Sequence, residues 1–322
     1  MNLVYFGSPE FSAEILESII KNTSPSSPSP YQGEGRGEVV AVVTSPDKPT
    51  GRKQLLVASP VAQMATKYDL PVFKPIKLDT SAKGRSAFGR NLAHLKLLKP
   101  DIFLVVSYGQ FIPQSWLDPP TLGCYNIHFS LLPKYRGALC ISEAIKNQDE
   151  QTGVTLIKMD DKLDHGPIIA QSEVAIDIED NVASLTTKLT QAAIKLLKTQ
   201  LPLITANNHK LQTISQDDSL ATYTPLIKSR TRESAFIPWE KISSAPAAET
   251  HALIRSLNPD PGAWTKIRIK EEGESGREIE LKIIKTTLKK NLSLNTYTLT
   301  LESVQLPGKK PISWQQYTSG HR

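Results

Sequence analysis

Val39-Val40-Ala41-Val42-Val43-Thr44 is an uninterrupted run of mostly β-branched residues. A run without polar alternation is typical of a strand that is buried on both faces of a parallel sheet. Further strands are predicted at residues 3–6, 70–73, 102–106, 123–127 and 153–159, and helices at 9–20, 60–68, 91–98, 141–146 and 181–197. This alternation predicts an α/β domain with a doubly wound, mostly parallel, Rossmann-like sheet.

The chain of 322 residues is long enough for two domains. The first is predicted over residues 1–206, with an insertion at 22–37 that is rich in Ser, Pro and Gly and cannot bury a core. Residues 207–227 are polar and poorly periodic and are predicted to form a linker. Residues 228–322 contain one predicted helix and several short strands, a pattern typical of a small, OB-like β-barrel.

The composition is that of a globular protein, with 39% hydrophobic and 22% charged residues. No segment approaches the roughly 18 consecutive apolar residues of a membrane span. The first residues lead directly into a strand, so we expect no export or organelle leader. Two cysteines cannot form a disulfide framework. We therefore expect a cytoplasmic protein without membrane contact. A monomer is also expected, although the sequence itself does not give the oligomeric state.

The positive charge is concentrated toward the C-terminus. Residues 1–206 hold 21 Lys and Arg against 20 Asp and Glu, whereas residues 207–322 hold 17 against 12. A basic C-terminal region is compatible with a nucleic-acid partner, although solvated charged faces are also common.

Two polar residues, Asn126 and His128, lie at the end of the strand predicted at residues 123–127. Residues two apart on a strand project to the same face, so we expect the amide and the imidazole to lie side by side. Ligands of such sheets bind beyond the carboxyl ends of the strands. The pair fits an acyl-transfer site. It is also compatible with buried side chains that satisfy backbone groups.

Two other kinds of site fit the sequence poorly. The first is a dinucleotide-binding site. The first predicted turn contains a single glycine, Gly7, and lacks the G-x-G-x-x-G pattern that allows a backbone to approach a pyrophosphate. A metal site made from Cys124, Cys140 and the nearby histidines matches no tight ligand spacing, so we expect no metal.

Acyl transfer without a covalent intermediate fits better. Asn126 offers N–H donors to an oxyanion, His128 can donate or shuttle a proton, and Asp164 can orient the ring. No G-x-S-x-G nucleophile elbow is present. His165 is a weaker candidate than His128 for the catalytic ring.

At these residues the chain resembles a known family. The pattern Asn126-x-His128-x-Ser130-Leu131-Leu132-Pro133-x-Tyr135-x-Gly137, followed by Leu163-Asp164-x-Gly166, resembles the signature of the enzymes that transfer formyl groups from 10-formyltetrahydrofolate. Other stretches are similar to the tRNA-acting branch of that family: Phe6-Gly7-Ser8-Pro9-Glu10-Phe11, Pro46-Asp47-Lys48-Pro49-x-Gly51-Arg52, Asn258-Pro259-x-Pro261-Gly262-Ala263-Trp264 and Pro307-Gly308-Lys309-Lys310.

The resemblance implies transfer of a formyl group from 10-formyltetrahydrofolate, a co-substrate, to the α-amine of initiator methionyl-tRNA. It implies Asn126, His128 and Asp164 as catalytic residues. The implied folate contacts are Ser130, Leu131, Leu132, Pro133, Tyr108 and Gly109, and the implied tRNA contacts are Lys48, Arg52 and Lys53. Alternatives are a sugar-nucleotide or purine-pathway formyltransferase and an RNA-binding relative without turnover.

The chain also departs from the usual family pattern around the pocket. Ala138-Leu139-Cys140 follows the Arg-Gly turn in place of small residues and Pro, and Phe129 is bulkier than the Gly or Ala often found there. Lys162 and His165 replace the commoner Gly and Thr beside the aspartate. We expect these changes to affect the shape of the pocket more than the reaction type.

Overall fold

The computed structural model describes residues 1–23, 38–51, 53–78, 87–206, 211–244, 246–269, 277–291 and 296–320. Residues 24–37 of the predicted insertion and Arg52 of the predicted tRNA loop lie outside the described residues. Residues 22 and 23 belong to the first helix.

The chain divides into two compact units that are each discontinuous in sequence. Unit 1 contains residues 1–138, 153–174 and 187–223, and unit 2 contains residues 139–152, 175–186 and 224–322. The predicted domain limits, with a linker at 207–227, stay a prediction, because compactness does not test independent folding.

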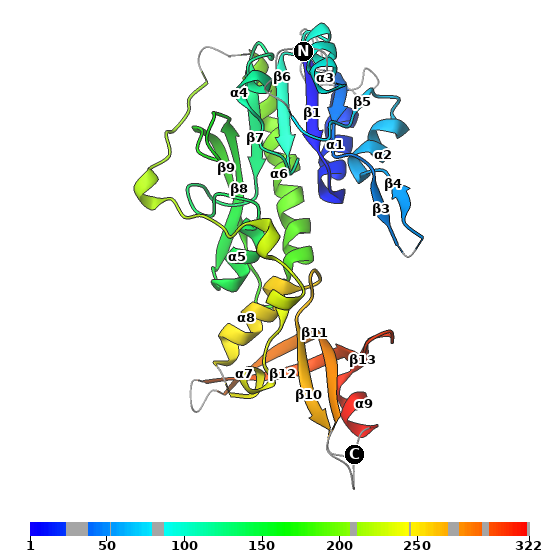
Figure 1. Ribbon diagram of the computed structural model, residues 1–322. Coiled ribbons are helices and arrows are strands. Elements are labelled where there is room, and N and C mark those ends of the chain that lie inside the picture. The colour runs from blue at the N-terminus through cyan, green and yellow to red at the C-terminus, as the bar shows by residue number, and fades with distance from the viewer. Residues whose placement is uncertain are drawn as a thin grey trace. The chain divides into compact units, whose positions relative to one another are not determined.

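A seven-stranded sheet in the order β5-β2-β1-β6-β7-β8-β9 lies almost entirely in unit 1 (Figure 1). Its strands are β1 Asn2–Gly7, β2 Glu38–Val43, β5 Val72–Phe73, β6 Ile102–Val106, β7 Gly123–His128, β8 Gln151–Lys158 and β9 Ile168–Ala175. The first five strands of this order are parallel to their neighbours, and β8 is antiparallel to β7. The predicted mostly parallel sheet is confirmed. Strand β9 was not predicted from the sequence, and most of its residues alternate between half-buried and exposed positions.

Six helices follow strands of this sheet or connect them. They are α1 Glu10–Thr23, α2 Pro60–Lys67, α3 Ala87–Leu97, α4 Gln114–Leu117, α5 Cys140–Lys146 and α6 Val182–Ala206. Helix α6 continues through Pro202, beyond the end at residue 197 that the sequence predicts. An interior proline removes one backbone donor and disfavours a helix, but Leu201 and Ile204 on either side of Pro202 are buried, so this turn is packed against the protein.

The core of unit 1 lies around β1 and β6. All five residues of β6 are buried, as are residues 3–7 of β1. The ring of Phe6 contacts Phe103, Tyr108 and Trp116, with ring centroids 5.0, 5.6 and 6.4 Å away. Full burial of such a side chain contributes roughly 1.5–3 kcal/mol. This packing fixes the carboxyl end of β6 beside that of β1.

Gly7, the single glycine of the first turn, is required by packing. A Cβ atom there would lie 2.0 Å from Ser12 Oγ and 2.9 Å from the Val106 carbonyl oxygen. The Ser12 hydroxyl donates to that carbonyl at 2.9 Å, and the Tyr5 hydroxyl donates to the Ser12 carbonyl at 2.7 Å. A close contact between α1 and the sheet therefore explains this glycine.

The loop after β2, which the sequence predicts to be irregular, contains a β-hairpin. Strand β3 (Lys48–Thr50) pairs antiparallel with β4 (Leu55–Val57). Gly51 begins the turn with φ of +71°, a conformation that glycine adopts without strain. All residues of both strands are exposed. The prediction missed the hairpin because Pro49 and Gly51 are more frequent in loops than in strands.

Unit 2 contains a four-stranded antiparallel sheet in the order β10-β11-β12-β13. These strands are Trp264–Ile269, Arg277–Asn291, Thr296–Gln305 and Ile312–Ser313, and the helices beyond α6 are α7 Trp239–Ser244, α8 Ala247–Leu257 and α9 Trp314–Ser319. The buried side chains of Leu281, Ile283 and Val304 pack with those of α8 and α9. The sheet is consistent with the predicted small barrel.

None of the helices among the described residues combines the length and the apolar character that crossing a membrane requires.

A buried histidine, His251 on α8, joins three segments of unit 2. Its Nδ1 lies 2.8 Å from Thr286 Oγ1, and its Nε2 lies 2.8 Å from the carbonyl oxygen of Ile178. A carbonyl oxygen only accepts, so Nε2 donates to Ile178 while Nδ1 accepts from the Thr286 hydroxyl. Burial, with help from the nearby Arg255, lowers the pKa of His251 below its usual range.

We expect this histidine to make unfolding pH-dependent. The unfolded chain protonates His251 near pH 6.5, whereas the folded chain does so only at lower pH, so the stabilisation is complete above about pH 6.5 and is lost as pH falls below it. In chemical denaturation across this range, His251→Gln should show a smaller pH dependence than the wild type. His94→Gln, at an exposed position of α3, is the control. Equal pH dependence in His251→Gln and wild type would contradict the prediction.

Candidate functional site

Asn126 and His128 lie on β7 and project to one face, as the sequence predicts. Across the antiparallel pair, Asn126 is opposite Ile157 of β8 and His128 is opposite Thr155. Asn126 is half-buried and His128 is 6% exposed. Both side chains reach the same carboxylate, that of Asp164.

The carboxylate of Asp164 connects the other two predicted catalytic residues. Asn126 Nδ2 donates to Oδ1 at 3.2 Å, and His128 Nδ1 lies 3.5 Å from Oδ2. The backbone N–H of Gly137 also donates to Oδ2, at 2.8 Å. The structure therefore brings together residues from β7, from the turn after it and from the loop after β8.

The loop that carries Asp164 is tightly packed. Asp164 has a φ of +48°, a left-handed conformation that a non-glycine residue adopts rarely and usually for a structural or functional reason. A Cβ atom at Gly166 would lie 1.8 Å from the Lys158 carbonyl oxygen. Only glycine fits there, which explains the spacing Asp164-x-Gly166.

The ring of His128 has an oxygen acceptor near each nitrogen. Nε2 donates to the Tyr135 carbonyl oxygen at 2.9 Å, and Nδ1 faces Asp164. A ring with acceptors on both sides can hold a hydrogen on each nitrogen. The cationic form of His128 therefore has a partner at both ends.

The predicted folate residues at 130–133 form a turn that is held by a local hydrogen bond and by a hydrogen bond from β8. The Ser130 hydroxyl donates to the Lys134 carbonyl at 2.6 Å, and the Thr155 hydroxyl donates to the Ser130 carbonyl at 2.6 Å. Ser130 and Leu132 are buried, whereas Leu131 and Pro133 are half-buried. The turn follows β7 directly, next to His128.

Tyr108 and Gly109, the other predicted folate residues, lie in different environments. The Tyr108 ring is buried against Phe6, and burial raises the pKa of its phenol. Its hydroxyl has no hydrogen-bond partner in the described part of the chain. Gly109 is exposed and has a φ of +86°. The ring of Tyr108 thus belongs to the core, whereas Gly109 is exposed.

The predicted tRNA-contacting cations Lys48 and Lys53 are exposed on the β3–β4 hairpin. Leu55 and Leu56 beside them are 63% and 72% exposed. The hairpin therefore combines cations with an uncovered apolar edge.

Two residues behind the predicted catalytic trio, Arg136 and Gln216, were not predicted from the sequence. Arg136 is only 2% exposed, and its Nη2 lies 2.9 Å from Gln216 Oε1 and 2.8 Å from Asp218 Oδ1. The hydrogen bond from Arg136 holds the pKa of Asp218 below its usual range. Gln216 lies in the stretch that the sequence predicts to be a linker, and its polar surroundings gave no signal of this contact. His165 lies 2.6 Å from Asp160, outside the trio.

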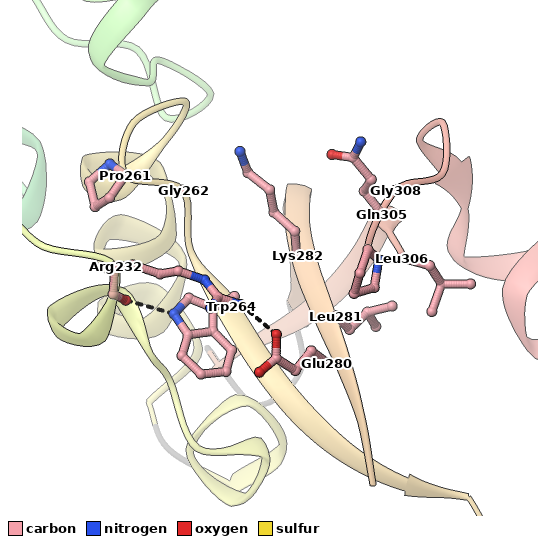
Figure 2. A pocket seen from close by; sticks show the side chains of 11 residues that line it. Arg232, Pro261, Gly262, Trp264, Glu280, Leu281, Lys282, Gln305, Leu306 and Gly308 are labelled. Carbon is pink, nitrogen blue, oxygen red and sulfur yellow. Dashed lines mark hydrogen bonds and ion pairs between the residues drawn. The ribbon is translucent and has the colours of Figure 1, made fainter. Parts of the chain in front are cut away.

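A separate pocket of about 230 Å³ lies in unit 2 (Figure 2). It is lined by Arg232, Pro261, Gly262, Trp264, Glu280, Leu281, Lys282, Gln305, Leu306, Pro307 and Gly308. Two C-terminal stretches that resemble the tRNA-acting branch, at 258–264 and 307–310, therefore meet at one place.

Two cations and one acid line this pocket. Arg232 forms an ion pair with Glu280, and its guanidinium lies 4.8 Å from the Trp264 ring centroid. Lys282 donates to the Pro259 carbonyl at 3.4 Å. A Cβ atom at Gly262 would lie 2.3 Å from the Lys282 side chain, so the glycine leaves room for that lysine. Lys282 is the positive charge that Glu280 does not balance.

Among the described residues, no three or more His, Cys, Asp or Glu side chains are grouped so that they could hold a metal ion. That the reaction needs no metal stays a prediction.

Comparison with known proteins gives consistent results. A family model described as formyl transferase matches residues 1–201. Proteins named methionyl-tRNA formyltransferase from Staphylococcus epidermidis and Dictyoglomus turgidum are 37% and 36% identical to the chain, over 99% and 100% of its length and 96% and 97% of theirs.

Solved structures share the fold at lower identity. A sugar 3N-formyl transferase superposes with a TM-score of 0.61 at 17% identity, over 96% of this chain and 99% of that one. A 4-N formyltransferase from Francisella tularensis gives 0.58 at 20% identity, over 86% and 96%. The chain belongs to the formyl transferase family and, within it, to the methionyl-tRNA formyltransferases.

Proposed function

We propose that this chain transfers the formyl group of 10-formyltetrahydrofolate to the α-amine of initiator methionyl-tRNA. The observation that carries the proposal is the contact of the Asp164 carboxylate with both Asn126 and His128 at the carboxyl end of β7. The names of the relatives that match the chain over almost its whole length support the same activity.

In the proposed mechanism, the free amine attacks the formyl carbon and an oxyanion develops on the formyl oxygen. Asn126 has one amide hydrogen that Asp164 Oδ1 does not use, and the cationic ring of His128 supplies positive charge beside it. Asp164 holds the ring and relays the proton of the amine toward the departing folate nitrogen. The turn at 130–133, the Tyr108 backbone and Gly109 are proposed to bind the folate. Only protons and the acyl group move, so the step requires neither an electron carrier nor a covalent intermediate.

The proposal is tested by one assay with three acceptors. The purified chain is incubated with 10-formyltetrahydrofolate and either charged initiator tRNA, glycinamide ribonucleotide or an amino-sugar nucleotide. We expect N-formylmethionine to form on the tRNA and little transfer to the other two acceptors. Preference for another acceptor would support an alternative formyltransferase, and no transfer to any acceptor would support an RNA-binding protein without turnover.

Asn126→Ala and His128→Ala should each lower kcat by about 10² to 10³, because each removes one stabilising group from the oxyanion. Single-turnover formyl transfer to charged tRNA measures the effect. His94→Gln is the matched control, because His94 is exposed on α3 and lies outside the trio. Wild-type kcat in either alanine variant would exclude that residue from the catalytic step.

The tRNA is proposed to contact two groups of cations, one on the β3–β4 hairpin and one in unit 2. Lys48, Lys53 and Arg52 of the hairpin loop would contact phosphates, although Arg52 lies outside the described residues. In unit 2, Lys282 at the pocket and the exposed Lys309 and Lys310 beside Gly308 provide further cations. Cations that neutralise phosphates release counterions, so binding is expected to weaken steeply with salt.

Lys53→Gln and Lys282→Gln should each reduce the slope of log K against log salt for initiator tRNA by about 1. Filter binding at several salt concentrations gives this slope. Lys67→Gln is the control, because the Lys67 ammonium is paired with Glu17 at 2.8 Å. An unchanged slope in Lys53→Gln or Lys282→Gln would remove that lysine from the tRNA contact.

A further inference from the structure

The segment at residues 211–223 passes beside the candidate site. Backbone hydrogen bonds hold it at Ile214 and at Thr222. The backbone N–H and carbonyl groups of Ile214 exchange hydrogen bonds with those of Ile168, both at 2.8 Å. The N–H of Arg136 donates to the Thr222 carbonyl at 2.8 Å. Between these anchors, Gln216 is half-buried within a run of exposed residues from 212 to 220. This pattern shows that Gln216 points toward the protein.

The side-chain amide of Gln216 uses both of its ends. Its Nε2 donates to the carbonyl oxygens of Asp164 and Gly166, each at 2.8 Å. Its Oε1 accepts from Arg136 Nε at 3.1 Å and from Arg136 Nη2 at 2.9 Å. An amide has two donor hydrogens and two acceptor lone pairs, so Gln216 is fully satisfied here.

Only one orientation of this amide is possible. If the oxygen and nitrogen were exchanged, the oxygen would face two carbonyl oxygens and the NH₂ group would face a guanidinium. The neighbours of Gln216 therefore fix its orientation. Glutamate, which is equally long, lacks both donor hydrogens.

These contacts form a closed loop of hydrogen bonds that includes both the side chain and the backbone of Asp164. On one side, the Asp164 carboxylate accepts from the Gly137 N–H at 2.8 Å. On the other side, the Asp164 carbonyl is connected through Gln216 to the side chain of Arg136, the residue next to Gly137. The turn at 135–137 thus holds Asp164 through both its side chain and its backbone.

We propose that Gln216 is a positioning residue for formyl transfer, which fixes the Asp164 loop so that its carboxylate faces His128. The inference rests on the proposed function, since positioning matters only if the trio is catalytic. His128 Nδ1 and Asp164 Oδ2 are already 3.5 Å apart, so a small displacement of the loop breaks the contact. Asp164 also has a left-handed backbone, and external hydrogen bonds help to hold such a conformation.

The test uses two variants with different losses. Gln216→Met keeps the length of the side chain and removes all four hydrogen bonds. Gln216→Glu keeps the acceptor for Arg136 and removes both donors to the Asp164 loop. Gln212→Met is the matched control, because Gln212 is the same residue type at an exposed position of the same segment.

We expect both Gln216 variants to lower kcat by about tenfold to a hundredfold, the loss that a displacement of roughly 1 Å can cause. The KM values for both substrates should stay within about twofold of wild type, and thermal unfolding should confirm that each variant is folded. Gln212→Met should behave as wild type. Wild-type kcat in Gln216→Met, or a change in KM alone, would overturn the proposal. Loss of activity in Gln216→Met with full activity in Gln216→Glu would also overturn it, because the contact with Arg136 would then suffice.

A readout without turnover separates this inference from the proposed function. The ring resonances of His128, followed by NMR at fixed pH, should shift in both Gln216 variants and not in Gln212→Met. If the wild type transferred no formyl group, the proposed function would fail, and this measurement would still show whether Gln216 positions Asp164 against His128. Unchanged resonances in the Gln216 variants would overturn the positioning role.

Discussion

One carboxylate, that of Asp164, accepts hydrogen bonds from the Asn126 amide and the Gly137 backbone while it faces the His128 ring. A half-buried charge of this kind is stable only when its lone pairs are satisfied. Three chain segments must therefore meet within hydrogen-bonding distance. The contacts of this carboxylate connect the end of β7 and the turn at 135–137 with the loop after β8.

Steric constraints of one kind recur at three glycines, one of which lies in the Asp164 loop. Gly166 passes so close to the Lys158 carbonyl that no side chain fits, and Gly7 packs equally closely against Ser12 and Val106. In unit 2, Gly262 leaves the room that the Lys282 side chain occupies. Each of these glycines belongs to a stretch that resembles the family pattern. Close approach of other groups explains all three, so these motif glycines are structural and the chemistry belongs to their neighbours.

The parallel sheet could be predicted because its strands are apolar runs buried on both faces. The apolar side chains of Ile102–Val106 and of the residues around Val42 are removed from water only when both faces of their strands are covered. The β3–β4 hairpin was missed because Pro49 and Gly51 are more frequent in loops than in strands, and β9 was missed because most of its residues alternate between half-buried and exposed positions. The pair Asn126 and His128 could be placed on one face by strand periodicity alone. Asp164 could be named as a residue able to orient the ring, but no local pattern places it against His128.

The sequence alone determined where most strands and helices of the sheet domain lie along the chain, that Asn126 and His128 share one face, and which family the chain resembles. These features depend on local periodicity and on short motifs. Only the tertiary structure decided which distant groups complete the site. In the sequence, Arg136 is one cation of the turn after β7 and Gln216 is part of a predicted polar linker, yet their side chains form hydrogen bonds with each other behind Asp164. Long-range hydrogen bonds leave no periodic pattern in a sequence. A polar residue that is paired with a partner 80 positions away cannot be told by its type from one that faces water.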